Sequence, residues 1–344
     1  MITASPRRAQ YVAPQESKTP RMRWQQAWRE AVTDPHELLE LVGLGHLAGE
    51  LLPATPPAFA MRVPRAFVAR MRHADPADPL LRQVLPLTAE LDDVPGFSSD
   101  AVGDLPARVA TGLLHKYAGR ALLIATGSCA VNCRYCFRRD FPYALETAAA
   151  SRWREAIAHI RTDASIEEVI LSGGDPLALA TPKLAELTEA LKDIPHLQRL
   201  RIHTRLPIVL PERVDEELSA WLSRLPWPVA VVLHANHANE LDESVAQACV
   251  RLRDGGANLL NQSVLLRGVN DDVDALTALS QRLFACGVLP YYLHQLDRVT
   301  GAAHFAVDDE RARGLIDSLR GRLSGYLVPR LVREIAGESA KTPL

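Results

Sequence analysis

Three cysteines stand close together in the middle of the chain, at Cys129, Cys133 and Cys136. Their spacing is C-x3-C-x2-C, and an aromatic residue, Tyr135, comes directly before the last of them. Three thiolates at this spacing suit a cubane [4Fe-4S] cluster, which normally takes four ligands. Because the loop offers three, the fourth iron would be open, and an open metal position is where chemistry takes place.

Two other interpretations of these cysteines are open from the residues alone. They could form a zinc site that lacks one ligand, or they could be buried apolar thiols. A zinc site needs a further Cys or His at a regular spacing. The remaining cysteines, Cys249 and Cys286, lie far along the chain in helix-like segments, and we expect them in the core. The spacing, the aromatic residue and the flanking residues together favour the iron–sulfur interpretation.

A glycine motif follows a later apolar run and reads Ser172-Gly173-Gly174-Asp175-Pro176. Two glycines after a strand allow a ligand to approach the backbone closely. An ordinary turn from strand to helix, with Asp as the cap and Pro at the first helical position, would show the same residues. The motif alone therefore leaves both interpretations open.

The composition excludes several classes of protein. The chain has 344 residues, with 39 basic and 41 acidic side chains, so its overall charge favours neither nucleic acid nor a membrane surface. No apolar run reaches membrane-spanning length, and the first twenty residues lack the apolar core of a signal peptide. Five cysteines, three of them clustered, are typical of a reducing compartment. We expect a cytoplasmic protein.

The sequence predicts four parts. Residues 1–22 read as a flexible tail, 23–118 as a helical N-terminal region, 119–330 as an α/β domain and 331–344 as a C-terminal segment. Six apolar runs of the α/β domain are strand candidates, at 120–125, 168–171, 200–203, 229–234, 259–265 and 290–296. From the second onward they recur about every 30 residues, the length of one βαβ unit.

Apolar strands that alternate with helices imply a parallel sheet with both faces covered. Six such units predict an incomplete (β/α)6 barrel with an N-terminal helical extension. Active sites of parallel barrels gather at the carboxyl ends of the strands. The cysteine loop follows the first strand and the glycine motif follows the second, so both belong where chemistry is expected.

Taken together, these motifs resemble the radical S-adenosylmethionine (SAM) superfamily and, within it, the lysine 2,3-aminomutase family. The segments that carry the resemblance cover most of residues 113–344 in order; they are Cys133–Arg139, Leu171–Leu177, Asn261–Asp271, Pro290–Asp297, Gly301–Phe305 and Lys341–Pro343. Further details, at Leu113–Tyr117, His234–Glu240 and Arg333–Leu344, resemble the branch that makes (R)-β-lysine for modifying elongation factor P.

The resemblance implies three cofactors. Cys129, Cys133 and Cys136 would bind a [4Fe-4S] cluster, whose open iron holds SAM and cleaves it to a 5′-deoxyadenosyl radical. The SAM contacts implied are Ser172, Gly173, Gly174, Gln262 and His234. The third cofactor is pyridoxal 5′-phosphate (PLP), which Lys341 would carry. The residues implied to bind PLP and its phosphate are Lys116, Tyr117 and Arg120.

The substrate would be L-lysine. By resemblance, Arg138 pairs with the substrate carboxylate, because a guanidinium suits it in a bidentate way, and Asp297 and Glu334 pair with the ε-ammonium. The family commonly has arginine at Lys116, tyrosine at His294 and aspartate at Glu334. These departures imply altered cofactor packing and altered affinity for lysine.

The expected function is conversion of L-lysine to (R)-β-lysine by 2,3-amino migration, for post-translational modification of elongation factor P. The expected partners are elongation factor P with its lysyl-ligase, and an electron donor such as flavodoxin or ferredoxin. Two alternatives remain: a radical SAM aminomutase for another amino acid, and an iron–sulfur regulatory module without enzymatic activity. The acidic pair Asp297 and Glu334 argues against a dicarboxylate substrate.

Overall fold

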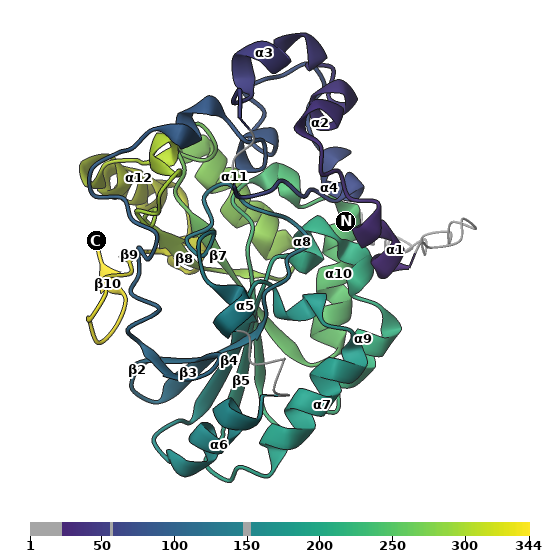
Figure 1. Ribbon diagram of the computed structural model, residues 1–344, viewed down its shortest axis with the longest axis vertical. Helices are drawn as coiled ribbons and strands as arrows, with labels where there is room; N and C mark the ends of the chain where they lie inside the picture. The colour runs from purple at the N-terminus through teal and green to yellow at the C-terminus, as the bar shows by residue number, and fades with distance from the viewer. Residues whose placement is uncertain (1–22, 56–57, 147–152) are drawn as a thin grey trace, which may run out of the picture.

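The computed structural model describes residues 23–55, 58–146 and 153–344. The tail predicted at residues 1–22 lies outside this part of the chain. One sheet of ten strands runs through the described residues, and the larger helices lie on its outer side (Figure 1). No helix in the described residues combines the length and the apolar character needed to cross a bilayer.

The strands follow one another across the sheet in chain order. Neighbours from β3 to β9 are parallel, whereas β1, β2 and β3 pair antiparallel and β10 returns antiparallel to β9. Their bounds are β1 Arg108–Ala110, β2 Leu113–Tyr117, β3 Arg120–Thr126, β4 Glu168–Gly173, β5 Arg199–Thr204, β6 Val229–Leu233, β7 Ala257–Val264, β8 Leu289–His294, β9 Arg330–Arg333 and β10 Thr342–Pro343. The parallel strands form the predicted incomplete barrel (Figure 1).

The central strands are apolar because both of their faces are covered. All six residues of β4 are buried, and Leu171 of this strand pairs with Leu123 of β3 and Ile202 of β5. Branched and long aliphatic side chains fill the core on either side, which is the pattern of parallel sheets packed between helices. This rigid frame fixes where the loops after the strands begin.

Helices connect the parallel strands and cover the outside of the barrel (Figure 1). They are α6 Arg154–Thr162, α7 Thr181–Lys192, α9 Glu216–Leu222, α10 Glu243–Asp254, α11 Val273–Ala285 and α12 Asp309–Arg322. Four of them begin after an aspartate that accepts a backbone N–H of the first turn: Asp215, Asp242, Asp272 and Asp308. Cys249 in α10 and Cys286 after α11 are buried, as predicted.

Short helices make up the N-terminal region and the remaining connections. In the N-terminal region they are α1 Trp24–Arg29, α2 Pro35–Leu41, η1 Gly45–Leu47, α3 Ala48–Leu51, α4 Arg65–Val68, η2 Leu81–Gln83 and η3 Thr88–Leu91. Later ones are α5 Tyr143–Glu146, η5 Pro176–Ala178, α8 Leu206–Val209, η6 Pro211–Arg213, η7 Ala238–Glu240, η8 Ala303–Phe305 and η9 Gly325–Leu327. Phe67, Leu80 and Leu81 join the main core, so this region packs on the barrel.

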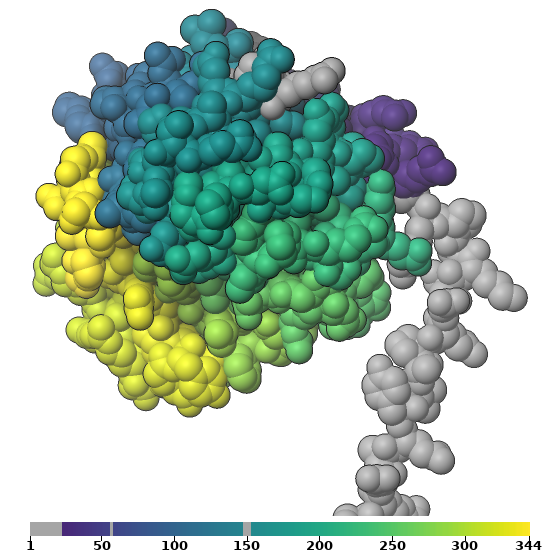
Figure 2. All heavy atoms as spheres, turned by 90° about the horizontal axis from the view of Figure 1, so that it is seen from below, coloured from purple at the N-terminus to yellow at the C-terminus, as the bar shows by residue number. Residues whose placement is uncertain are grey.

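Two predicted boundaries are wrong in detail. The region 23–118 contains strands β1 and β2 besides its helices, and β9 belongs to the barrel although it lies mostly within the segment 331–344. In β9 two buried residues stand between two arginines, which is too short a run for an apolar pattern. The C-terminal segment, yellow in Figure 2, lies against the blue part of the chain that holds β1 and β2.

Candidate active site

A cavity of about 670 Å³ lies within the barrel at the carboxyl ends of the parallel strands. Residues from Phe59 in the N-terminal region to Lys341 in the C-terminal segment line it, so it is built by segments that are far apart in the sequence. The lining includes all fifteen residues that the sequence assigned to a site: Lys116, Tyr117, Arg120, Cys129, Cys133, Cys136, Arg138, Ser172, Gly173, Gly174, His234, Gln262, Asp297, Glu334 and Lys341. Their individual roles stay predictions.

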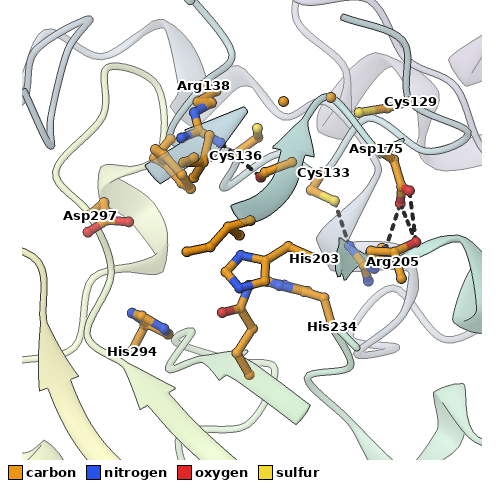
Figure 3. Close-up of a pocket in the computed structure, with 18 of the residues that line it drawn as sticks. Cys129, Cys133, Cys136, Arg138, Asp175, His203, Arg205, His234, His294 and Asp297 are labelled. Atoms are coloured by element: carbon orange, nitrogen blue, oxygen red, sulfur yellow. Dashed lines mark hydrogen bonds between the residues drawn. The ribbon is translucent and has the colours of Figure 1, made fainter. Parts of the chain in front are cut away.

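The three cysteines lie in the loop after β3, across the upper part of the cavity in Figure 3. The Cys136 N–H donates to the Cys133 carbonyl at 3.0 Å, and the Asn132 amide donates to the Ala60 carbonyl at 2.9 Å. Burial and the neighbouring thiols raise the pKa of Cys129 well above its ordinary value and that of Cys136 to about 11. Such thiols fit a metal site, because a bound cation stabilises the thiolate.

The glycine motif packs directly on the cysteine loop. A Cβ on Gly174 would lie 2.5 Å from the Ser128 carbonyl oxygen, and a Cβ on Gly173 would lie 2.5 Å from that of Thr126. Gly173 also has φ +116°, which favours glycine. The Gly174 N–H donates to the Thr126 carbonyl at 2.8 Å. The end of β4 and the cysteine loop are therefore joined through their backbones.

Asp175 follows the glycines and ties three segments together. As the turn interpretation predicted, its Oδ1 accepts the Leu177 N–H at 3.0 Å, and Pro176 is the first residue of η5. It also accepts the Thr204 hydroxyl at 2.7 Å and the Arg205 N–H at 2.7 Å. Burial raises the pKa of Asp175 to about 6. The helix cap at Asp175 and the close backbone contact at Gly173 and Gly174 thus occur together in one motif.

Arg138 lies in the cavity wall and is 7% exposed. Its Nε donates to Asp104 Oδ2 at 2.6 Å, and its Nη1 donates to Ser172 Oγ at 3.2 Å. The other oxygen of Asp104 lies 2.6 Å from Lys116 Nζ. One aspartate from the N-terminal region therefore holds two cations that the resemblance assigns to anionic groups.

Two acidic side chains share the opposite part of the lining. Glu334 contacts Lys116 at 3.1 Å and also forms an ion pair with Lys341. Burial raises the pKa of Glu334, but Lys341 and Lys116 outweigh it and hold this pKa at about 2. Burial and the nearby Glu334 raise the pKa of Asp297 to about 7. The two carboxyl groups therefore differ in charge near neutral pH.

Three histidines line the cavity and are neutral near pH 7. Burial lowers the pKa of His203 and of His234 well below its ordinary value, and burial with the nearby Lys341 lowers that of His294 to about 3. The ring of His234 stacks on Tyr135, with Nε2 3.0 Å from the hydroxyl. The buried Nε2 of His294 has no hydrogen-bond partner in the described structure, so it can accept or donate to a ligand.

Sequence reasoning missed several polar residues of this cavity, among them Asp104, Arg201, His203 and Arg205. Arg201 pairs with Glu168 through two hydrogen bonds of 3.0 and 2.6 Å. His203 and Arg205 stand at the end of β5, so the rule on strand ends could have found them. Asp104 lies in a loop without a local pattern, and only the fold brings it to Arg138.

Residues 123–278 match the family model of the Radical SAM superfamily. Over 324 residues the chain is 50% identical to L-lysine 2,3-aminomutase of Escherichia coli (strain K12), and the aligned region covers 93% of this chain and 94% of that protein. It is 45% identical over 335 residues to L-lysine 2,3-aminomutase of Haemophilus influenzae, covering 96% and 98%. A radical SAM methyltransferase from Sphaerobacter thermophilus gives a TM-score of 0.44 at 18% identity, covering 64% of this chain and 68% of that one.

Proposed function

Because the chain belongs to the L-lysine 2,3-aminomutase family of radical SAM enzymes, we propose that it converts L-lysine to (R)-β-lysine with the help of PLP. Membership makes it an isomerase that uses a [4Fe-4S] cluster and SAM, which excludes the regulatory module. One observation carries the proposal. The three cysteines, Lys341 and the pair Asp297 and Glu334 all line one cavity.

We assign Cys129, Cys133 and Cys136 as the cluster ligands. The cluster, once bound, supplies the electron for SAM cleavage and hence the radical that starts the reaction. Gly173 and Gly174 let the end of β4 pack against the cysteine loop, and we assign both to the SAM site beside that loop. Other side chains assigned to SAM are Ser172, His234 and Gln262.

The lining also fits PLP. Lys341 is partly buried at the cavity wall, and the unpaired Nε2 of His294 offers a polar contact to an aromatic ligand. Lys116 and Arg120 provide cations for a phosphate, and the Arg120 guanidinium lies 4.5 Å from the ring centroid of Tyr117. PLP, carried by Lys341 at rest, would supply the aldehyde carbon to which the migrating nitrogen stays attached.

The two ends of the substrate find opposite charges in the cavity. Arg138, kept in place by Asp104 and Ser172, would receive the carboxylate. Asp297 and Glu334 would receive the ε-ammonium, and Glu334 already pairs with an ammonium group, that of Lys341. Fixing both ends places the reacting carbons, and this placement is the contribution of the protein to the rate.

The product and its destination rest on the resemblance at residues 113–117, 234–240 and 333–344. On that basis the β-lysine serves the modification of elongation factor P by its lysyl-ligase in the cytoplasm. A low-potential protein such as flavodoxin or ferredoxin would reduce the cluster. The alternative of another amino acid as substrate is less favoured, because the two acids would repel a dicarboxylate.

An anaerobic turnover assay tests the proposal. The protein is reconstituted with iron and sulfide and is then given PLP, SAM, dithionite and L-lysine, with glutamate in a parallel reaction. Formation of β-lysine only when every component is present supports the proposal. Cleavage of SAM without β-lysine would move the substrate to another amino acid. Turnover without added PLP, in protein shown to be free of it, would exclude the proposed role of PLP.

A further inference from the structure

Arg205 lies beside one of the three cysteines. It follows β5, is 6% exposed, and directs its guanidinium toward the cysteine loop (Figure 3). Its Nη1 donates to the Cys133 sulfur at 2.7 Å and to the Tyr135 hydroxyl at 2.6 Å. Its own N–H binds Asp175, so the same residue contacts the segment that follows the glycine motif.

The guanidinium is held by partners from other parts of the chain. Its Nη2 donates to Gln83 Oε1 at 2.7 Å and to Glu240 Oε2 at 3.0 Å. Glu240 is itself fixed, because its Oε1 accepts the Asn236 N–H at 2.8 Å and the Gln83 amide at 3.1 Å. These contacts leave the guanidinium little freedom to turn away from Cys133.

Aromatic rings close the remaining sides of this arrangement. The Arg205 guanidinium carbon lies 5.5 Å from the ring centroid of Phe67 and 5.7 Å from that of Tyr135. Glu240 is fully buried. The cation and its counterion therefore act on Cys133 through a medium from which water is largely excluded, where charges interact more strongly than in water.

We propose that Arg205 is a positioning residue for the iron–sulfur cluster, which fixes the Cys133 thiolate and raises the reduction potential of the cluster. This inference rests on the proposed function, since it needs Cys133 as a cluster ligand. Reduction adds one electron from the low-potential donor to the cluster. A nearby positive charge and a hydrogen bond to a ligand sulfur stabilise that added negative charge. Glu240 opposes the effect in part, so the pair sets the potential.

The test is the midpoint potential of the reconstituted holoenzyme, followed by electron paramagnetic resonance during a reductive titration. Glu240→Gln removes the negative charge and keeps a hydrogen-bonding side chain, so its potential should be more positive than wild type. The double variant Arg205→Met with Glu240→Gln leaves no unpaired charge buried. Its potential should be more negative than wild type, because the nearer charge is lost. Equal potentials in all three proteins would overturn the proposal.

Arg213→Met is the matched control, since Arg213 is also a buried arginine but lies outside the cavity. Its potential should equal wild type, and a shift like that of the double variant would overturn the proposal. If the double variant does not fold, the test rests on Glu240→Gln alone: a more positive midpoint potential supports the proposal, and an unchanged potential overturns it. Iron content of Cys133→Ala separates the two levels. If Cys133→Ala binds as much iron as wild type, the assignment of Cys133 as a cluster ligand is refuted. If Cys133→Ala loses the cluster but the Glu240 and double variants keep the wild-type potential, only the role of Arg205 is refuted.

Discussion

Asp297 and Glu334 line the same cavity, yet their surroundings move their pKa values in opposite directions. Burial disfavours the charged form of both carboxyl groups. Glu334 has Lys116 and Lys341 within ion-pair distance, so it stays ionised, whereas its charge further raises the pKa of Asp297 to about 7. Divergent pKa values in one pocket are typical of functional sites. Asp297 is thus the acid whose charge a substrate ammonium would change.

This difference predicts a pH dependence. Only ionised Asp297 attracts an ammonium, so kcat/KM for lysine should rise by up to about tenfold between pH 6 and pH 8 as the carboxyl loses its proton. Asp297→Asn should lower kcat/KM by more than about tenfold at pH 8 and flatten the profile. Steady-state kinetics of the reconstituted enzyme measures both. A flat wild-type profile, or an unchanged slope in the variant, would contradict the assignment.

Two lysines of the cavity can be told apart by their partners. Lys116 contacts Asp104, Glu334 and the Val102 carbonyl, which fits a phosphate-binding cation held in place. Lys341 forms its ion pair with Glu334 near the chain end. We therefore expect Lys341→Ala to abolish the absorbance above 400 nm that a lysine–PLP bond gives, with Lys116→Ala weakening PLP binding by about tenfold and keeping the band. The reverse result would exchange the two roles.

The elements of the barrel show what a sequence reveals and what it hides. Strands β3 to β8 are apolar runs between helices, so their pattern predicts them. The strands β1, β2 and β9 include charged residues and give no such signal. β1 has no buried residue, and β2 and β9 have two each, which is too short a run for an apolar pattern. Their place in the sheet comes from pairing with neighbours that are distant in the sequence.

The site divides in the same way. Motifs with fixed spacing, such as the cysteine loop and the residues from Ser172 to Asp175, could be recognised from the sequence and do line one cavity. Asp104 could not be recognised, because its partner, Arg138, lies 34 residues away and only the fold brings the two together. The place of Arg205 at a strand end could have been read, but its contact with Cys133, 72 residues away, could not. Residues that bind a ligand are therefore easier to predict from the sequence than residues that keep those ligand-binding side chains in position.

The contact between the glycine motif and the cysteine loop predicts a specific failure. Gly174→Ala places a Cβ against the Ser128 backbone, so the loop must shift, at a cost of about 1–3 kcal/mol. We expect iron content after reconstitution to fall by more than half. Gly314→Ala is the control, because nothing lies within 4 Å of its Cβ and alanine favours the helix. Equal iron content in both variants would refute the coupling.

Across the described part of the molecule, the N-terminal region and the C-terminal segment hold the cavity together. The N-terminal region contributes Glu90, which binds Arg134 at 2.7 Å and Arg139 at 2.8 Å in the cysteine loop. The C-terminal segment contributes Glu334, which binds Lys116 of β2 across the open side of the barrel. Parts outside the parallel strands thus fix the loop and join the edges of the sheet.

Glu90→Ala tests this arrangement, because it leaves Arg134 and Arg139 buried without their shared counterion. Breaking a buried pair costs about 3–5 kcal/mol, so the urea midpoint should fall clearly and the reconstituted cluster should be lost at lower urea. Glu189→Ala removes an acid that pairs with Lys192 on an exposed helix face, and it should leave both midpoints unchanged. Midpoints that coincide for the two variants would show that the N-terminal region does not support the cysteine loop.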